Sequence, residues 1–303
     1  KGDLLATENR RMRMVQMPLS ATEDRVLGSI DVEKALREGV KAFQPGLLAG
    51  ANQNILYIDE VNLLPDHLVN AILDAASSGW NVVEREGISV THPSRFVLIG
   101  SMNPEEGDLR PQILDRFALH AETDNIENPQ QRIEITHRNL EFETNPVNFR
   151  NRYQAECEEI RRRIADARRL LPQVGVSEGI LQSLAQACAE MQVDGHRPDI
   201  VAVRAARALA AFNGRTQVKP EDVVTGSELA LSHRTRRAGL EEPATPKLIR
   251  ESVEQALQHF KVWMEPEAPR HEMLSRLDAV QAPGGLKAKS IKASVPPSGP
   301  LSV

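Results

Sequence analysis

Two adjacent carboxylates, Asp59 and Glu60, directly follow the apolar run ILYI at residues 55–58. A short apolar run of this kind is typical of a buried strand in a parallel sheet. Acids at such a position are costly unless a cation lies close to them. Phosphoryl transfer brings one, because Mg²⁺ bridges the nucleotide phosphates while a base directs the attacking water. The pair therefore fits a Walker B motif, in which Asp59 holds Mg²⁺ through water and Glu60 polarises the attacking water. Alternatively, the two acids stabilise the start of the next helix.

A second apolar run, FVLI at residues 96–99, leads to the polar residue Asn103. Neighbouring parallel strands end at the same edge of a sheet, so Asn103 is placed to help orient the same water. Asn103 also begins the sequence NPEEG, in which Pro104 favours a turn. The two roles are compatible.

The sequence ILDRF at residues 113–117 places Arg116 beside Asp115 after an apolar pair. An arginine in such a position is usually exposed or held in an ion pair. In a ring-shaped ATPase it would instead enter the site of the neighbouring subunit as an arginine finger and neutralise charge on the γ-phosphate.

The elements that must position these residues follow from the hydrophobic pattern. Strand, helix, hairpin and strand alternate in the first 128 residues, which indicates an α/β fold with parallel strands. We expect three strands, at 10–19 (ending at Pro18), 55–58 and 95–99. Helices are expected at 32–38, capped by Asp31 and ended by Gly39, and at 65–78. A hairpin at 81–92 should turn at Glu86-Gly87, and a loop or hairpin should have Pro45-Gly46 at its turn.

The second half of the chain has a helical pattern. Residues 129–171 are helical and dense in charge, and Pro172 ends this stretch. Residues 177–261 predict a helical domain, in which Pro220 suits a first helical position. From Pro266 onward Pro, Gly, Ser and Lys dominate, which predicts a disordered tail.

Composition narrows the class of protein. The 303 residues suffice for two domains, and the net charge of −5 argues against a large nucleic-acid surface. Cys157 and Cys188 are far apart and near no histidine pair, so they fit a reducing compartment and neither zinc nor a disulfide is expected. We identify no apolar run of the ~18 residues that a membrane span needs and no signal peptide.

Three long stretches, residues 18–64, 81–120 and 231–237 (LSHRTRR), resemble the AAA+ ATPase subunit I family of magnesium chelatases. The resemblance runs from about Met17 to about Arg237. It implies an α/β AAA+ core with a parallel sheet and β-hairpin inserts, around residues 40–53 and 81–93, followed by an all-α helical lid. The implied domains are the core at 1–128, a long connecting helical segment at 129–172, the lid at 173–262 and the tail at 263–303.

The resemblance also implies roles for single residues. Asp59 and Glu60 match the Walker B motif, Asn103 matches sensor 1, and Arg116 matches the arginine finger. Arg204, in VAVRAARALAA, matches the sensor 2 arginine that reaches the nucleotide bound to its own subunit. The implied cofactors are ATP and Mg²⁺. By pattern alone, Arg204 could equally be a surface residue of a helix.

The implied activity is that of an ATP-driven motor. Subunit I forms a homo-oligomeric ring, which we expect to be a hexamer, and hydrolyses ATP between subunits. It acts with a D-type AAA+ subunit on a porphyrin-binding H subunit, which inserts Mg²⁺ into protoporphyrin IX in chlorophyll and bacteriochlorophyll biosynthesis. The expected location is the cytoplasm, or the plastid stroma in a photosynthetic eukaryote.

One feature of the family has no counterpart in these residues. The family has a phosphate-binding loop, GxxxxGK[ST], before the region that matches. Here the cluster GGLKAKS at 284–290 follows no predicted strand, and we interpret it as unrelated to phosphate binding. Either the first strand and its phosphate loop have been lost by truncation, which we expect, or the protein never had them. A non-hydrolysing D-type scaffold, an ATPase for cobalt or nickel chelation and a chaperone of the wider group are the alternative functions.

Overall fold

The computed structural model describes residues 10–30, 37, 43–85, 88–123, 125–193, 195–234 and 244–260. The chain divides into two units, residues 1–262 and 263–303, and every described residue belongs to the first. Asp31, Gly39, the turn at Glu86-Gly87 and the predicted disordered tail lie outside the described residues, as does the predicted helix 32–38 apart from residue 37.

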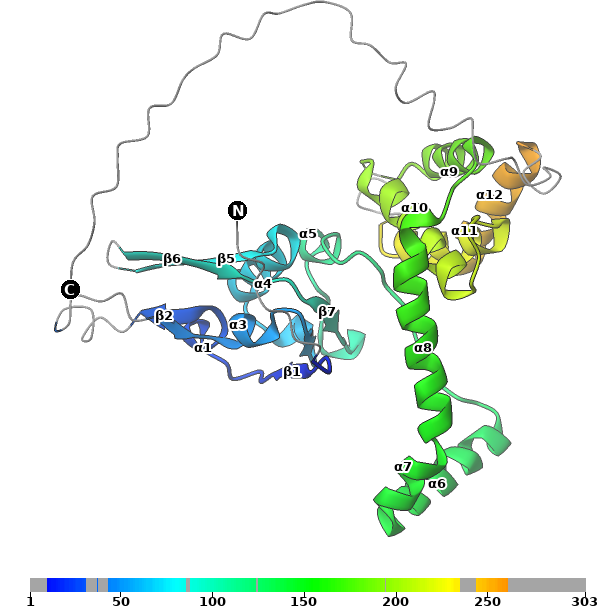
Figure 1. Cartoon of the computed structure of the whole chain (residues 1–303). Helices are drawn as coiled ribbons and strands as arrows, with labels where there is room; N and C mark the ends of the chain where they lie inside the picture. The colour runs from blue at the N-terminus through cyan, green and yellow to red at the C-terminus, as the bar shows by residue number, and fades with distance from the viewer. Residues whose placement is uncertain are drawn as a thin grey trace, which may run out of the picture. The chain divides into compact units, whose positions relative to one another are not determined.

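A three-stranded parallel sheet forms the centre of the first half of the chain (Figure 1). Its strands are β1 (Met14–Met17), β4 (Ile55–Ile58) and β7 (Val97–Gly100), in the order β1-β4-β7. The parallel pairing confirms the predicted α/β class. Strand β1 is shorter than the predicted 10–19, because its pairing with β4 begins at Met14 opposite Ile55. Pro18, which has no N–H to donate, follows its last residue.

One face of the sheet carries the core. Helix α4 (Asp66–Ser78) forms where the pattern predicts it and buries Leu68, Val69, Ile72, Leu73 and Ala75. These residues belong to the same buried cluster as Leu56 and Ile58 of β4. Gly79 ends α4 in the left-handed region at φ 76°, where glycine carries little strain.

The other face of the sheet remains open in the part of the chain that the structure describes. Met14 and Val97 lie in one row across the sheet on either side of Ile55, and Ile99 lies on the same face two residues after Val97. Met14 is 64% exposed, Val97 53% and Ile99 45%. Parallel sheets are normally covered on both faces, so this face has room for a further layer.

Two antiparallel hairpins lie side by side next to the sheet (Figure 1). Strands β5 (Trp80–Arg85) and β6 (Ile88–Pro93) confirm the predicted hairpin. Strands β2 (Gly28–Ile30) and β3 (Phe43–Pro45) form the other. The predicted turn at Pro45-Gly46 is wrong, because Pro45 ends β3 and Gly46 precedes the next helix. A Cβ atom on Gly46 would lie 2.4 Å from the amide nitrogen of Gly28, so only glycine allows this approach.

Short helices complete the first half. They are α1 (Glu23–Leu27), α3 (Leu47–Ala51), α5 (Pro111–Leu114) and the 3₁₀ turns η1 (Val61–Leu63) and η2 (Pro104–Glu106).

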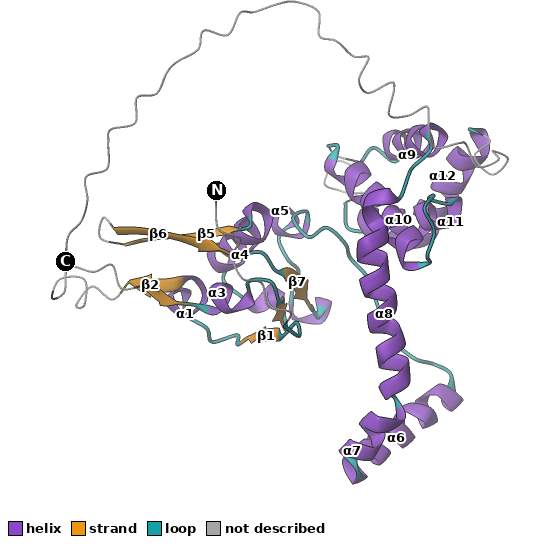
Figure 2. Cartoon of the chain, in the orientation of Figure 1, coloured by secondary structure: helices purple, strands orange, loops and turns teal. Residues whose placement is uncertain are grey.

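Every named element after β7 is a helix (Figure 2). The segment expected to be one long connection consists of α6 (Pro129–Thr144), α7 (Pro146–Arg152), α8 (Gln154–Leu170) and the turn η3 (Leu171–Gln173). The first break has a local cause, since Pro146 disfavours helical geometry at the residue before it. Asn145 accordingly has φ −152°, and its side chain accepts a hydrogen bond from the amide of Asn148 to start α7.

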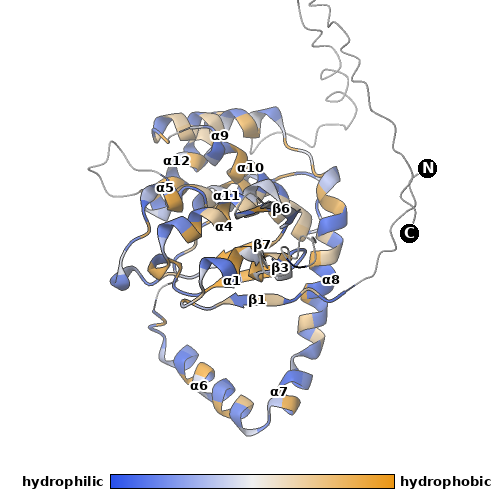
Figure 3. Ribbon diagram, turned by 90° about the vertical axis from the view of Figure 1, so that its left-hand side faces the viewer, coloured by the Kyte–Doolittle hydropathy of each residue, from blue (hydrophilic) through white to orange (hydrophobic). Residues whose placement is uncertain are grey.

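Helix α6 buries none of its residues. Figure 3 shows that apolar residues alternate with hydrophilic ones along it, and Ile133, Ile135 and Leu140 are each more than half exposed. No described part of the chain covers these three side chains.

The last four helices enclose a separate core. They are α9 (Glu178–Glu190), α10 (Arg197–Phe212), α11 (Pro220–Leu231) and α12 (Pro246–His259). Pro220 takes the predicted first position of α11. Helices α10 and α11 approach closely at Gly226, which has no side chain. A Cβ atom at this position would lie only 2.9 Å from the carbonyl oxygen of Ala202. The α/β core followed by a helical lid agrees with the predicted fold class.

Candidate active site

The register of β4 and β7 brings Asp59 to the carboxyl edge of the sheet beside Ser101, because Ile58 pairs with Gly100. The hydroxyl of Ser101 donates to Asp59 Oδ1, and the hydroxyl of Tyr57 donates to the same oxygen at 3.1 Å. These hydrogen bonds, that of Ser101 first, hold the pKa of Asp59 below its usual value. The Asp59 carboxylate is exposed. It is therefore ionised at neutral pH and accessible to a hydrated cation.

Glu60 adopts an unusual backbone conformation at this edge. Its φ of 52° and ψ of 56° lie in the left-handed region, which a residue with a side chain rarely occupies. Its amide nitrogen donates to Ser101 Oγ at 3.2 Å, and the next amide, of Val61, donates to the Ser101 carbonyl oxygen at 2.9 Å. Strain of this kind costs about 1–3 kcal/mol and is found at functional sites. The turn thus sets the direction in which the half-buried Glu60 side chain leaves the strand.

Asn103 follows β7 and is exposed. Its side-chain oxygen accepts a hydrogen bond from the amide of Glu105 at 3.2 Å, so its role in starting a turn is present. Asn62, two residues beyond Glu60, donates from Nδ2 to the carbonyl oxygens of Asn103 at 3.3 Å and Gly107 at 2.9 Å. Asn62 thereby joins the turn after β4 to the turn after β7. The role of Asn103 toward an attacking water stays a prediction.

Arg116 follows α5, where its side chain is held by α4. Its Nη1 donates to Asp74 Oδ1 at 2.9 Å and to Asn70 Oδ1 at 3.3 Å. The Arg116 and Asp74 side chains are 38% and 68% exposed. Ion pairs this accessible to water contribute only about 0–1 kcal/mol, so the arginine can leave Asp74 at little cost.

One lid arginine that contacts the Arg116 segment is Arg197, at the start of α10. Its Nη2 donates to the Arg116 carbonyl oxygen at 3.1 Å. Arg204 lies seven residues further along the same helix, about 10 Å up its axis, and is exposed. Among the described residues, no hydrogen bond joins Arg204 to any of the other four predicted site residues. No local pattern in the sequence indicates this contact, because Arg197 and Arg116 lie 81 residues apart.

Arg207 has a different task. It donates from Nε to the carbonyl oxygen of Val174 and from Nη2 to that of Leu171, both at 3.1 Å. It therefore fastens η3 to α10 and is a structural residue.

The oxygen ligands at the sheet edge are few, and they fit a magnesium ion that is bound mainly by water and by phosphates. Mg²⁺ usually keeps several waters and takes one or two carboxylates together with substrate phosphates. Asp59 supplies one accessible carboxylate and Ser101 one hydroxyl. Among the described residues, no group of three or more His, Cys, Asp or Glu could hold a metal by itself.

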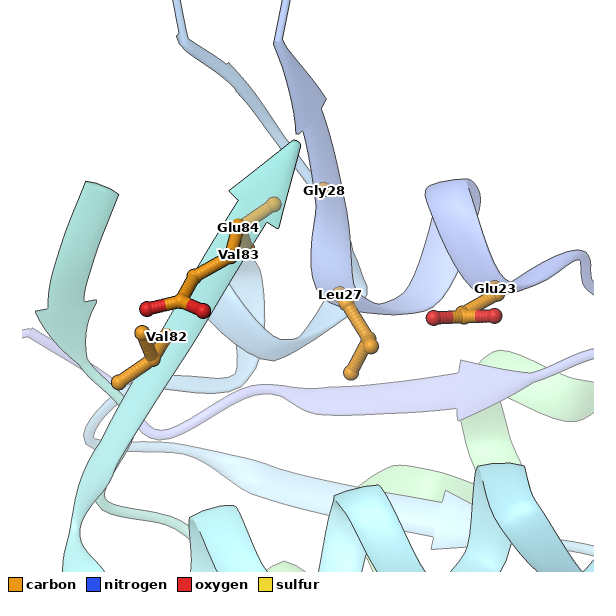
Figure 4. A pocket seen from close by; sticks show the side chains of 6 residues that line it. All are labelled: Glu23, Leu27, Gly28, Val82, Val83 and Glu84. Atoms are coloured by element: carbon orange, nitrogen blue, oxygen red, sulfur yellow. The ribbon is translucent and has the colours of Figure 1, made fainter. Parts of the chain in front are cut away.

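A pocket of about 420 Å³ opens between α1, β2 and β5, at the base of the two hairpins (Figure 4). None of its lining residues is a predicted site residue. They are Glu23, Leu27, Gly28, Val82, Val83 and Glu84.

Fold and site together define an AAA module with its lid. Residues 4–117 match the AAA domain of the dynein-related subfamily, and residues 181–260 match the AAA lid domain. A crystal structure of a protein from Cytophaga hutchinsonii shares this fold at a TM-score of 0.55 and 20% identity, over 81% of this chain and 76% of that chain.

Sequence relatives narrow the class further. A magnesium-chelatase subunit ChlI homolog of Methanocaldococcus jannaschii is 49% identical over 86% of this chain and 70% of its own length. The chloroplastic magnesium-chelatase subunit ChlI of Chlamydomonas reinhardtii is 53% identical over 84% of this chain, which spans 61% of that relative. The chain belongs to the family of magnesium-chelatase ChlI subunits. In the described part of the chain, no helix has the length and apolar character to cross a membrane.

Proposed function

We propose that the protein is the ATP-hydrolysing motor subunit of a magnesium chelatase, which couples hydrolysis to the insertion of Mg²⁺ into protoporphyrin IX by a partner subunit. The observation that supports this most strongly is the edge formed by β4 and β7. There, an ionised, accessible Asp59 lies beside a strained Glu60, in a chain of the ChlI family.

Each residue at the edge has a distinct task in this proposal. Bound Mg²⁺ would neutralise charge on the β- and γ-phosphates. Asp59 would hold a water of that ion. Glu60, whose side-chain direction is set by its left-handed backbone, would orient and polarise the attacking water. Asn103 lies at the end of the neighbouring strand, where Asn62 fixes its main chain, and it aligns the same water.

Phosphate binding requires one more part. A backbone cradle must grip the phosphates, and the ChlI family resembled here carries it in a GxxxxGK[ST] loop. The experiments below therefore use a version of the protein that includes a phosphate-binding loop.

The test of the hydrolysis site is Glu60→Gln. This change keeps the shape of the side chain but removes its charge, so ATP should bind normally while turnover falls by ~10²-fold or more. Nucleotide binding and phosphate release, measured on the same sample, separate the two steps. Wild-type turnover in Glu60→Gln would remove Glu60 from the mechanism.

We further propose a ring in which Arg116 acts on the nucleotide of the neighbouring subunit. The weak hold of Asp74 on Arg116 supports this role, because the arginine can leave its own chain at little cost. A finger contributes ~10³- to 10⁵-fold in turnover.

Mixed rings test the finger. Arg116→Ala subunits keep their hydrolysis site, and Glu60→Gln subunits keep their finger. A mixture should hydrolyse ATP although neither variant does so alone, because one competent interface is rebuilt. Mixed rings without hydrolysis, with mixing confirmed by mass, would mean that Arg116 acts within its own chain.

The proposed partners are a D-type AAA+ subunit and a porphyrin-binding H subunit, in the cytoplasm or plastid stroma. Reconstitution with both, followed by the absorbance of the metalloporphyrin, tests this step with Mg²⁺, Co²⁺ and Ni²⁺ in turn. A second candidate is a non-hydrolysing scaffold. Metal insertion that persists with Glu60→Gln subunits would support the scaffold.

A further inference from the structure

One buried lid residue, Arg234, fastens the main chain on both sides of Arg116. Its side chain is 2% exposed. Its Nε donates to Asp115 Oδ1 at 3.0 Å and its Nη2 to the Asp115 carbonyl oxygen at 2.8 Å. The guanidinium also donates to the carbonyl oxygens of Phe117 at 2.6 Å and Ala118 at 3.4 Å. All of these acceptors belong to residues 115–118, the segment that carries the candidate finger.

Neighbouring groups strengthen this attachment. His233 donates from Nε2 to the Phe117 carbonyl oxygen at 3.1 Å. The amide of His120 donates to the carbonyl oxygen of Leu229 in α11 at 2.8 Å. Arg234 itself is fixed to the end of α11 by a hydrogen bond to the Ala230 carbonyl oxygen at 3.1 Å. The segment is thus bound to the last turn of a lid helix.

The side chain of Arg116 is anchored elsewhere. It contacts Asp74 and Asn70 of α4 in the α/β core, through an ion pair accessible to water. The main chain of the segment is therefore tied to the lid by several hydrogen bonds, and the buried guanidinium of Arg234 donates three of them. The side chain of Arg116 is tied only loosely to the core. A movement of α11 would carry the backbone of Arg116 and break the weaker side-chain contact first.

We propose that Arg234 is a positioning residue that couples the lid of one subunit to the arginine finger it offers to the next. This inference rests on the proposed ring function and adds to it a route by which the state of a subunit's own lid changes hydrolysis in its neighbour. Arginine suits the position because its planar fork reaches several acceptors at once, whereas a lysine ammonium on a flexible stem cannot satisfy the same set.

The test places the Arg234 change on one side of the interface at a time. The reference is the mixture of Glu60→Gln and Arg116→Ala subunits, in which Glu60→Gln subunits donate the finger. With Arg234→Met added to the Glu60→Gln donor, hydrolysis should fall by roughly 10²-fold, the effect of a small misplacement of a catalytic group. With Arg234→Met added instead to the Arg116→Ala acceptor, hydrolysis should stay within about twofold of the reference.

This asymmetry separates positioning from a general effect on folding, which would lower both mixtures. Equal losses in the two arrangements, or no loss in the donor arrangement, would overturn the proposal. An inactive reference mixture would instead contradict the ring function itself. Arg250→Met is the matched control. Arg250, in α12, pairs with Glu228 of α11, the helix that Arg234 follows, but it does not contact residues 115–118.

A second measurement covers the case in which Arg234→Met does not fold. Arg234→Lys keeps the charge, and amide hydrogen exchange of this chain reports the segment directly. We expect faster exchange at 115–120 in Arg234→Lys, with α9 and α12 unchanged. Unchanged exchange at 115–120 would show that Arg234 does not hold the segment and would overturn the proposal.

Discussion

Ser101, at the end of β7, donates a hydrogen bond to the carboxylate of Asp59 and accepts one from the amide of Glu60. A single hydroxyl thereby joins the group proposed to hold magnesium to the strained turn of the group proposed to orient water. Both contacts follow from the parallel register, which sets Ile58 opposite Gly100 one residue earlier.

Ser101→Ala should therefore impair two functions at once. Loss of the hydroxyl raises the pKa of Asp59 toward its usual value and leaves the Glu60 turn without one of its supports. We expect a higher magnesium requirement and turnover reduced by ~10-fold or more, since small misplacements at a reacting centre cost up to ~10²-fold. Magnesium titrations of ATPase activity measure both effects. Ser77→Ala, at an exposed position in α4, serves as the control.

The acid limb of the pH profile gives an independent check of Ser101. A carboxylate with a lowered pKa stays charged as the pH falls, so activity that depends on ionised Asp59 persists to lower pH in the wild type than in Ser101→Ala. Coincident acid limbs in the two proteins would show that Ser101 does not act through Asp59.

Arg197 should matter more for hydrolysis than Arg204. Arg197 contacts the main chain of the finger residue, whereas Arg204 is exposed two turns further along α10. We expect Arg197→Ala to lower ATPase activity at least tenfold more than Arg204→Ala does. The reverse order, with weakened nucleotide binding in Arg204→Ala, would restore Arg204 to the role that the family resemblance implies. Arg207 cannot serve as a neutral control, because it holds η3 in place.

The outcome for these arginines illustrates what a sequence can and cannot predict. Asp59 and Glu60 could be placed at a sheet edge because an apolar run immediately before them predicts a buried strand. Helix α4 and the β5–β6 hairpin have equally strong local signals. Arg197 and Arg234 have none, since their partners lie 81 and more than 110 residues away.

Weak local signals also explain the errors in the fold. Strands β2 and β3 have three residues each, and the approach of Gly46 to Gly28 fixes their ends, which is a contact between distant residues. The break before Pro146 did have a local signal, because proline restricts the residue before it. The charge-rich helical pattern on both sides of Pro146 is nevertheless the stronger signal, and it predicts one continuous segment.

The stability of the lid should depend strongly on Asp222, a buried residue at the start of α11. Its carboxylate accepts two hydrogen bonds from Arg215, at 2.6 and 2.7 Å, and one from the amide of Lys219 at 2.9 Å. Asp222→Ala leaves the guanidinium without its partner, and we expect a loss of about 3 kcal/mol in the free energy of unfolding. Urea denaturation measures this loss. Glu221→Ala, at the exposed neighbouring position, should change stability by less than about 0.5 kcal/mol.

The lid attachment should weaken in acid through His233. Burial, and then the charge of Arg234, lowers the pKa of His233 from 6.5 to about 4. Its Nε2 is engaged with Phe117, and no described residue forms a hydrogen bond with the buried Nδ1. Between pH 6.5 and about 4, the unfolded chain binds a proton here that the folded chain does not. The contribution of His233 to the free energy of unfolding is therefore fully present above pH 6.5 and is lost as the pH drops toward 4.

We expect this loss to be on the order of 2 kcal/mol. It can be measured as the difference in the free energy of unfolding between wild type and His233→Gln at pH 7.0, 6.0, 5.0 and 4.5. Glutamine can still donate to the Phe117 carbonyl oxygen but cannot titrate, so its stability should fall less steeply with acid. Exposed His67→Gln should leave the slope of the wild type unchanged. Parallel curves for His233→Gln and wild type would mean that His233 is protonated equally in the folded and unfolded chains, and acid would then leave the hold of α11 on residues 115–118 intact.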